Sequence, residues 1–127
     1  MLKKILYWLP AIIYMAVIFA MSSLPAPEPA KQVPIFFEIK LVHIVEYGIL
    51  CGLIIFALLN TMKVPLVQLL VFAILLTVLY GISDEIHQAF NPARTARWQD
   101  VVANLTGSSI VAISYAWTAK NFNGVKR

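Results

Sequence analysis

The sequence predicts an all-α integral membrane protein, a bundle of four transmembrane helices. Apolar residues make up 61% of the 127 residues and charged residues only 13%, about half the ~25% found in an average soluble domain. The apolar residues are also gathered into long segments, and a helix needs about 20 mostly apolar residues to cross a bilayer. The predicted spans cover residues 5–22, 41–59, 64–83 and 101–119. A chain of this length forms one domain, residues 1–127.

Each segment has its own justification. The first follows Lys3 and Lys4 and has the basic start of a signal peptide. Its apolar stretch is longer than the usual signal core of ~7–15 residues, so a retained span is favoured. The second is interrupted only by His43 and Glu46, and the last two carry no charge. Residues 12–19 are apolar on all sides, which argues against a soluble bundle, whose helices keep a polar face.

The connections and the basic residues predict an orientation. Residues 22–40 hold four of the seven prolines and are expected to form an extended loop. Residues 60–63 are expected to form a tight hairpin, and residues 84–100 a third loop. Counting basic residues favours both termini inside, with six inside against four outside: Lys3, Lys4, Lys63, Lys120, Lys126 and Arg127 against Lys31, Lys40, Arg94 and Arg97. These basic residues form no patch interleaved with aromatics, so no nucleic-acid partner is expected.

The unusual polar residues fall at the span ends that would meet at one membrane face. His43, Glu46 and Tyr47 have i, i+3, i+4 spacing and share one helix face, and so do Asp84, His87 and Gln88. The sequence therefore predicts an outward-facing polar pocket. Its expected ligand-binding residues are Ser22, Ser23, Lys40, His43, Glu46, Tyr47, Asp84, Glu85, His87, Gln88, Arg94, Asp100 and Asn104. Gly48, Gly52 and Gly107 are expected to permit close contact between helices.

Glu46 is the strongest single clue, because a charged residue inside a span costs about 2.5–3.5 kcal/mol on insertion scales. One interpretation is a structural ion pair with Arg94, Arg97 or Lys40. The other is a ligand-binding or acid/base group, and the possible catalytic residues are then Glu46, Asp84, His87 and His43.

Three weaker patterns leave further alternatives open. His43 and His87 stand near carboxylates at helical spacing, as metal ligands do, but neither forms a closed motif, so no metal and no cofactor are predicted. Ser22 and Ser23 are either nucleophiles with a histidine base or residues that cap a helix end. Arg94 and Arg97 suit phosphate or carboxylate groups, and equally suit lipid headgroups as snorkelling side chains.

Taken in order, these motifs resemble the VanZ-like family. The resemblance rests on Ser22-Ser23-x-Pro25, on Lys40-x-x-His43-x-x-Glu46-Tyr47, on Asp84-Glu85-x-His87-Gln88, and on Arg94 with Asp100-x-x-x-Asn104-x-x-Gly107. It implies a small, multi-pass protein of the bacterial cytoplasmic membrane. The name-giving member is associated with low-level resistance to the glycopeptide teicoplanin. Many members have Asp-Lys before the histidine, where this chain has Ile39-Lys40, so a role needing that carboxylate falls to the neighbouring Glu38 or is lost.

Three functions follow as hypotheses. The first is binding of a membrane lipid headgroup or a cell-envelope glycolipid, with a link to teicoplanin resistance. The second is an enzyme that acts on an envelope lipid by acid/base or metal-assisted chemistry, and the sequence does not decide between enzyme and binding protein. The third is a structural helper of larger envelope proteins. Self-association is plausible, because four short spans enclose little interior.

Overall fold

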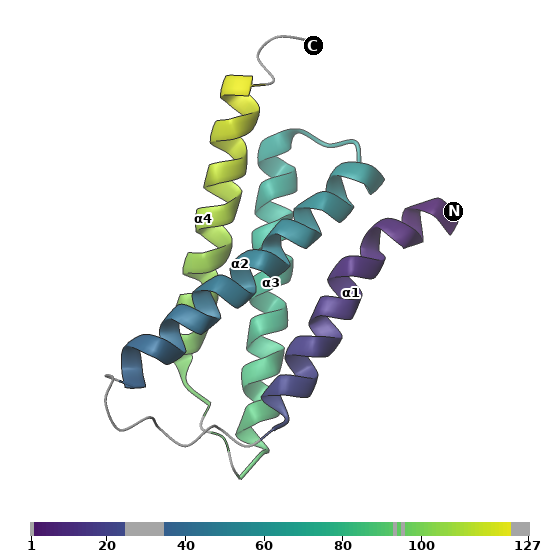
Figure 1. The fold of residues 1–127 in the computed structure, drawn as a ribbon. Helices are drawn as coiled ribbons and strands as arrows, with labels where there is room; N and C mark the ends of the chain where they lie inside the picture. The colour runs from purple at the N-terminus through teal and green to yellow at the C-terminus, as the bar shows by residue number, and fades with distance from the viewer. Residues whose placement is uncertain (1, 25–34, 93, 95, 123–127) are drawn as a thin grey trace.

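The computed structural model describes residues 2–24, 35–92, 94 and 96–122. This part of the chain is all-helical, which confirms the predicted fold class, with α1 (Leu2–Ser22), α2 (Ile35–Thr61), α3 (Leu66–Ala89) and α4 (Trp98–Phe122). Successive helices run in opposite directions (Figure 1). The start of α1, the α2–α3 connection and the end of α4 therefore lie at one end of the bundle, and the end of α1 and the starts of α2 and α4 lie at the other.

Three of the four helices are long and apolar enough to cross a membrane: Lys3–Ser22, Lys40–Thr61 and Leu66–Ala89. The 25-residue α4 is also long enough. Its mean hydropathy is lower, because polar side chains such as Asn104, Ser108 and Ser109 follow one another along it. The fourth predicted span is thus present as a helix, and its crossing of the membrane stays a prediction.

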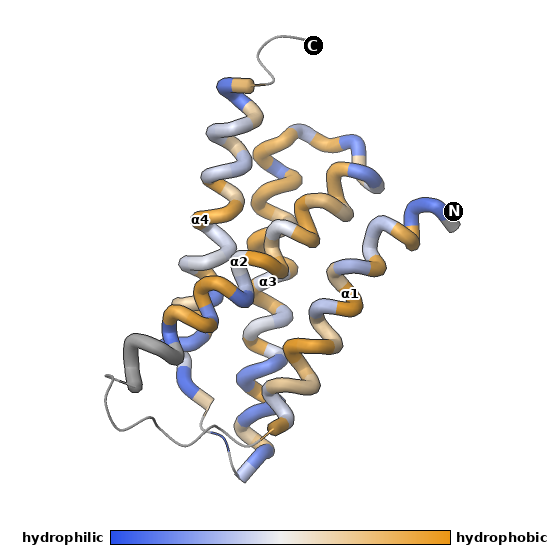
Figure 2. The backbone as a smooth tube through the Cα atoms, in the orientation of Figure 1, coloured by the Kyte–Doolittle hydropathy of each residue, from blue (hydrophilic) through white to orange (hydrophobic). Residues whose placement is uncertain are grey.

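Many large apolar side chains face outward, and several polar side chains are buried beside the apolar core. Val67 and Leu79 on α3 and Ile113 and Trp117 on α4 are exposed, whereas Asn104 is fully buried. The colouring in Figure 2 shows apolar residues along most of the helices, with hydrophilic stretches concentrated at their ends. A soluble bundle has the opposite arrangement, so the outer surface fits hydrocarbon and the interior fits hydrogen bonding between helices.

Helix α2 is the central element, since it packs against α1, α3 and α4 and most extensively against α4. The α2–α4 contact is close at Gly107, where an added Cβ would overlap the backbone carbonyl oxygen of Ile44. Gly48 faces Gly107 across this contact. These two glycines therefore permit the close approach that the sequence predicts. Cys51 is fully buried in the same core.

The helix bounds differ from the predicted spans most at the start of α2 and at the end of α3. Helix α2 begins at Ile35, so the first predicted connection ends too late, and its residues 25–34 lie outside the described residues. Pro65 has φ −54° and ψ 142° and precedes the first turn of α3. Proline suits the start of a helix, because it fixes φ and has no N–H to donate. At its other end α3 continues through Asp84 to Ala89, so residues 84–89 are helix rather than loop.

Candidate functional site

The predicted polar residues converge at the end of the bundle where α1 and α3 end and α2 and α4 begin (Figures 1 and 2). All of them lie in the described part of the chain. We call the buried part of this assembly the polar cluster. It comprises Lys40, His43, Tyr47, Asp84, Glu85, Gln88, Asp100 and Asn104.

Helices α2 and α4 are joined by two polar contacts. The ammonium group of Lys40 pairs with Oδ1 of Asp100, one turn into the bundle from the loops. One further turn inward, Nδ1 of His43 lies 3.1 Å from Oδ1 of the fully buried Asn104. Since an amide oxygen only accepts, Nδ1 of His43 carries the proton in this arrangement and Nε2 is the basic nitrogen.

Helix α3 contributes two adjacent acids with different partners. Oδ2 of Asp84 accepts a hydrogen bond from Nε2 of Gln88 at 2.8 Å and a long one from the hydroxyl of Tyr47 at 3.5 Å. Oε2 of Glu85 accepts the backbone N–H of Arg97 at 2.9 Å, which ties the start of α4 to the end of α3. The i, i+4 bond between Gln88 and Asp84 also explains why α3 continues past residue 83.

Several buried polar atoms of the cluster have no hydrogen-bond partner among the described residues. They are Oδ1 of Asp84, Oε1 of Glu85 and Nδ2 of Asn104. Asp84, Glu85 and Asp100 are each at most 7% exposed, and a ring nitrogen of His43 and one oxygen each of Glu85 and Asp100 lie within 4.8 Å of one another. Two of the three unpartnered atoms are acceptors, so the cluster has more acceptors than donors.

Glu46 lies beside the cluster on α2 and is half-buried. It is within electrostatic reach of Asp84 on α3 and of Arg94. Within the described residues its carboxylate makes no hydrogen bond and no ion pair within 4.0 Å. Lys40, one of the cations considered as an ion-pair partner for Glu46, instead pairs with Asp100.

The rim of the site fastens the end of α1 to the segment after α3. Arg94 donates from Nε to the carbonyl of Leu24 and from a terminal nitrogen to the carbonyl of Met21, both at 2.7 Å. Asn91 donates to the carbonyl of Ser23 at 3.1 Å. The last carbonyls of a helix lack partners within the helix, and these side chains supply them. The structure thus uses the Arg94 guanidinium to cap α1.

The two predicted serines differ in their surroundings. Ser22 is buried and its hydroxyl donates to the carbonyl of Phe19 at 3.0 Å. Ser23 donates to the same carbonyl at 2.7 Å, and its Oγ also lies 3.1 Å from Nε2 of His87. The ring of His87 packs on Phe19, with ring centroids 4.3 Å apart. Only Ser23 is therefore placed beside a histidine.

The site contains residues that the sequence analysis did not assign to it. Gly81 lies one turn before Asp84, and an added Cβ there would be 2.5 Å from Nδ2 of Asn104. Gly81, Asp84 and Gln88 have i, i+3, i+7 spacing, and this pattern is the signal that could have revealed Gly81. Asn91 and the backbone N–H of Arg97 have no comparable sequence signal, because their contacts depend on how the loop folds.

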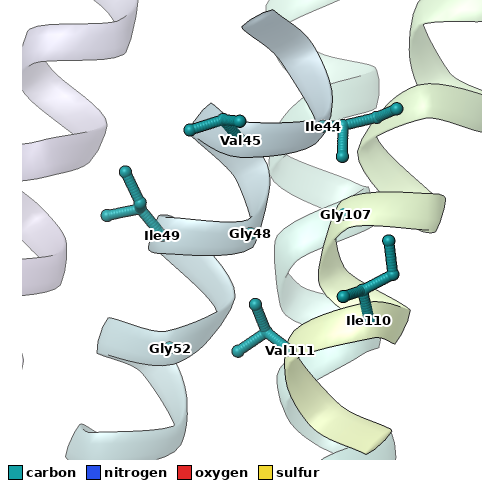
Figure 3. Close-up of a pocket in the computed structure, with 8 residues that line it drawn as sticks. All are labelled: Ile44, Val45, Gly48, Ile49, Gly52, Gly107, Ile110 and Val111. Carbon is teal, nitrogen blue, oxygen red and sulfur yellow. The ribbon is translucent and has the colours of Figure 1, made fainter. Parts of the chain in front are cut away.

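Two apolar grooves lie between helices of the bundle. One, of about 440 Å³, runs between α2 and α4 over Gly48, Gly52 and Gly107 (Figure 3). The other, of about 360 Å³, lies between α1 and α2 and includes Tyr14 and Leu53. The lining of both suits acyl chains rather than headgroups, so any polar ligand must reach the cluster from the end of the bundle.

Comparison with known proteins gives one match. The sequence model of the VanZ/LLP1 family matches residues 7–119. No curated protein and no solved structure matches the chain. The matched region includes all four motifs on which the sequence resemblance rests, and it covers most of the chain. The chain therefore belongs to the VanZ/LLP1 family.

Proposed function

We propose that this chain is a multi-pass protein of the bacterial cytoplasmic membrane whose polar cluster binds the headgroup of a lipid or a cell-envelope glycolipid. In this proposal both termini are cytoplasmic, as the count of basic residues favours, and the cluster faces outward. Any effect on teicoplanin susceptibility then follows from binding of that glycolipid.

The observation that supports this proposal is the surplus of acceptors at one end of the bundle. Oδ1 of Asp84 and Oε1 of Glu85 are buried without hydrogen-bond partners among the residues that the structure describes, and Glu46 is a half-buried carboxylate near them. Leaving a buried acceptor unpaired costs about 1–3 kcal/mol, and more when it is charged. A ligand that brings donors removes this cost. The proposed headgroup therefore presents an ammonium group or several hydroxyl groups toward the acids.

Glu46→Gln tests this proposal with a variant that should still fold. Glutamine keeps the shape of the side chain and removes a charge that is costly inside a span. We expect unchanged or higher thermal stability in detergent. We also expect at least about tenfold less retention of phosphatidylethanolamine, because hydrogen bonds to charged groups contribute about 1.5–3 kcal/mol. Native mass spectrometry of protein equilibrated with equal amounts of phosphatidylethanolamine and phosphatidylglycerol measures this retention.

Thr118→Ala is the matched control. Thr118 is an exposed polar residue of α4 that bonds to the carbonyl of Ser114, far along the helix from the cluster. Its variant should retain lipid as the wild type does. Equal retention by wild type and Glu46→Gln, or a preference for phosphatidylglycerol, would contradict headgroup binding by the acids. Unfolding of Glu46→Gln would instead support the structural role of the cluster.

A second candidate function rests on the 3.1 Å distance between Oγ of Ser23 and Nε2 of His87. A serine beside a histidine base can attack an acyl or phosphoryl group of a lipid. In the structure, however, the Ser23 hydroxyl donates to the carbonyl of Phe19, and Asp84 is bonded to Gln88 and Tyr47. The third member of a triad is thus absent among the described contacts of His87, and headgroup binding is the better-supported function.

A fluorophosphonate probe distinguishes this second candidate. If Ser23 is a nucleophile, the probe should label the wild type and fail to label Ser23→Ala and His87→Ala. Ser22→Ala is the matched control, because Ser22 makes the same bond to the carbonyl of Phe19 without a histidine neighbour. Absence of labelling in the wild type, or loss of labelling in Ser22→Ala alone, would contradict catalysis by Ser23.

A further inference from the structure

Three potential metal ligands from three different helices meet inside the polar cluster. They are a ring nitrogen of His43 on α2, a carboxylate oxygen of Glu85 on α3 and one of Asp100 on α4, all within 4.8 Å of one another. Zinc binds histidine nitrogen and carboxylate oxygen at about 2.0–2.2 Å in tetrahedral sites, so two of its ligands lie roughly 3.4 Å apart. Small side-chain rotations would therefore bring these three atoms onto one ion.

A separate observation indicates that Glu85 is prepared for such an ion. Its Oε2 accepts the backbone N–H of Arg97, which fixes the carboxylate. Its Oε1 is buried and has no hydrogen-bond partner in the described part of the chain. An acceptor in that position gains most from a cation, because no donor of the described residues compensates its charge.

The histidine is oriented by a second contact. Nδ1 of His43 donates to Oδ1 of Asn104, which leaves the lone pair on Nε2. Metal-bound histidines are commonly held in this way, with one ring nitrogen on an oxygen and the other on the ion. Asn104 is fully buried, so this contact with the imidazole is shielded from solvent.

The charge of the cluster also favours a cation. Asp84 is close enough to interact electrostatically with both Glu46 and Glu85. Glu85 also interacts electrostatically with Asp100. Lys40 pairs with Asp100 and lies within electrostatic reach of Glu85. Its ammonium group is therefore paired with one of the three potential ligands, Asp100, and supplies part of the positive charge that an ion would bring.

We propose that His43, Glu85 and Asp100 form a binding site for a divalent metal ion of the Zn²⁺ or Mn²⁺ type, and that the Lys40 ammonium competes with the metal for Asp100. One imidazole with two carboxylates suits these ions. Lys40 stands at the rim with its side chain 15% exposed, so its flexible stem allows the ammonium to move to the surface when a metal enters. The remaining coordination positions are left to water or to a ligand. The site shares His43, Glu85 and Asp100 with the polar cluster of the proposed function, but metal binding requires no lipid and does not involve Ser23.

Titration calorimetry with ZnCl₂ tests the proposal on the full chain in detergent, after removal of any affinity tag that contains histidine. The wild type should bind one Zn²⁺ per chain. Lys40→Met should bind at least about tenfold more tightly, because a competing unit charge is gone. Glu85→Gln should bind roughly a hundredfold more weakly or not at all, because a ligand is lost.

The two histidines of the chain provide the matched pair. His43→Gln should lose binding, and His87→Gln should bind within about threefold of the wild type, since His87 is bonded to Ser23 instead. Circular dichroism shows whether each variant is folded, and Glu85→Gln decides the result if His43→Gln is not. Absence of stoichiometric Zn²⁺ binding, equal affinity of Lys40→Met and wild type, or loss of binding in His87→Gln would overturn the site.

Discussion

Gly107→Ala should unfold the bundle more readily than any other single methyl addition described here. An added Cβ would overlap the carbonyl oxygen of Ile44 and lie 2.8 Å from its carbonyl carbon. Both atoms belong to the backbone of α2, so no side chain can move aside and the two helices must separate. We expect a loss at the upper end of the ~1–3 kcal/mol that overpacking costs.

The chain provides both the control and the reporter for this experiment. An added Cβ at Gly52 would meet only a methyl group of Val111 at 3.7 Å, an ordinary contact. Gly52→Ala should therefore be as stable as the wild type or slightly more stable, because alanine favours helix. Cys51 is the single cysteine and is buried, so thermal unfolding can be followed with a thiol-reactive fluorophore. Equal midpoints for the two variants would show that α2 and α4 are not in this close contact.

Lys40→Met should have the second largest effect. Removing one partner of a buried ion pair leaves the other charge uncompensated, at a cost of about 3–5 kcal/mol. The Lys40 side chain is partly exposed, so the expected loss lies below this range. Asp100→Asn should cost less, because Lys40 still lies within electrostatic reach of the carboxylate of Glu85. The measurement is the midpoint of thermal unfolding in metal-free buffer.

A double-mutant cycle separates the ion pair from the packing of the lysine stem. Lys40→Met combined with Asp100→Asn should be more stable than Lys40→Met alone, because the unpaired carboxylate is gone. Lys63→Met, in the exposed α2–α3 connection, is the control and should change stability by less than about 0.5 kcal/mol. Strict additivity of the two cluster substitutions would indicate that Lys40 and Asp100 do not interact.

The sequence predicted the fold class and the end at which the polar residues meet, because both follow from local patterns. Apolar runs give the helices, and short connections force neighbouring helices to run in opposite directions. The spacing of His43, Glu46 and Tyr47 correctly placed three polar side chains on the side of α2 that faces the bundle or its margin. The sequence does not predict the extension of α3 to Ala89, because charged residues near a membrane face occur both in loops and in the last turns of helices.

Pairing within the site could not be predicted from the sequence. An ion pair is one of the two interpretations of Glu46, and the structure instead gives Lys40 to Asp100 and the Arg94 guanidinium to carbonyls at the end of α1. Both outcomes depend on helix rotation and on distances between segments that are about 60–70 residues apart in sequence. Hydrophobic periodicity indicates which side of a helix is inward, but not which polar groups across the interface come within 3 Å.

The contacts between α2 and α4 have a consequence for biogenesis. Lys40 and His43 are synthesised 60 and 61 residues before their partners Asp100 and Asn104. When α2 first enters the bilayer, its polar side chains therefore have no partners, and only the arrival of α4 supplies them. Until α4 has been translated, these side chains of α2 depend on water or lipid headgroups for their hydrogen bonds. A chain truncated before residue 98 would keep the three most apolar helices but lack the α4 partners of Lys40 and His43.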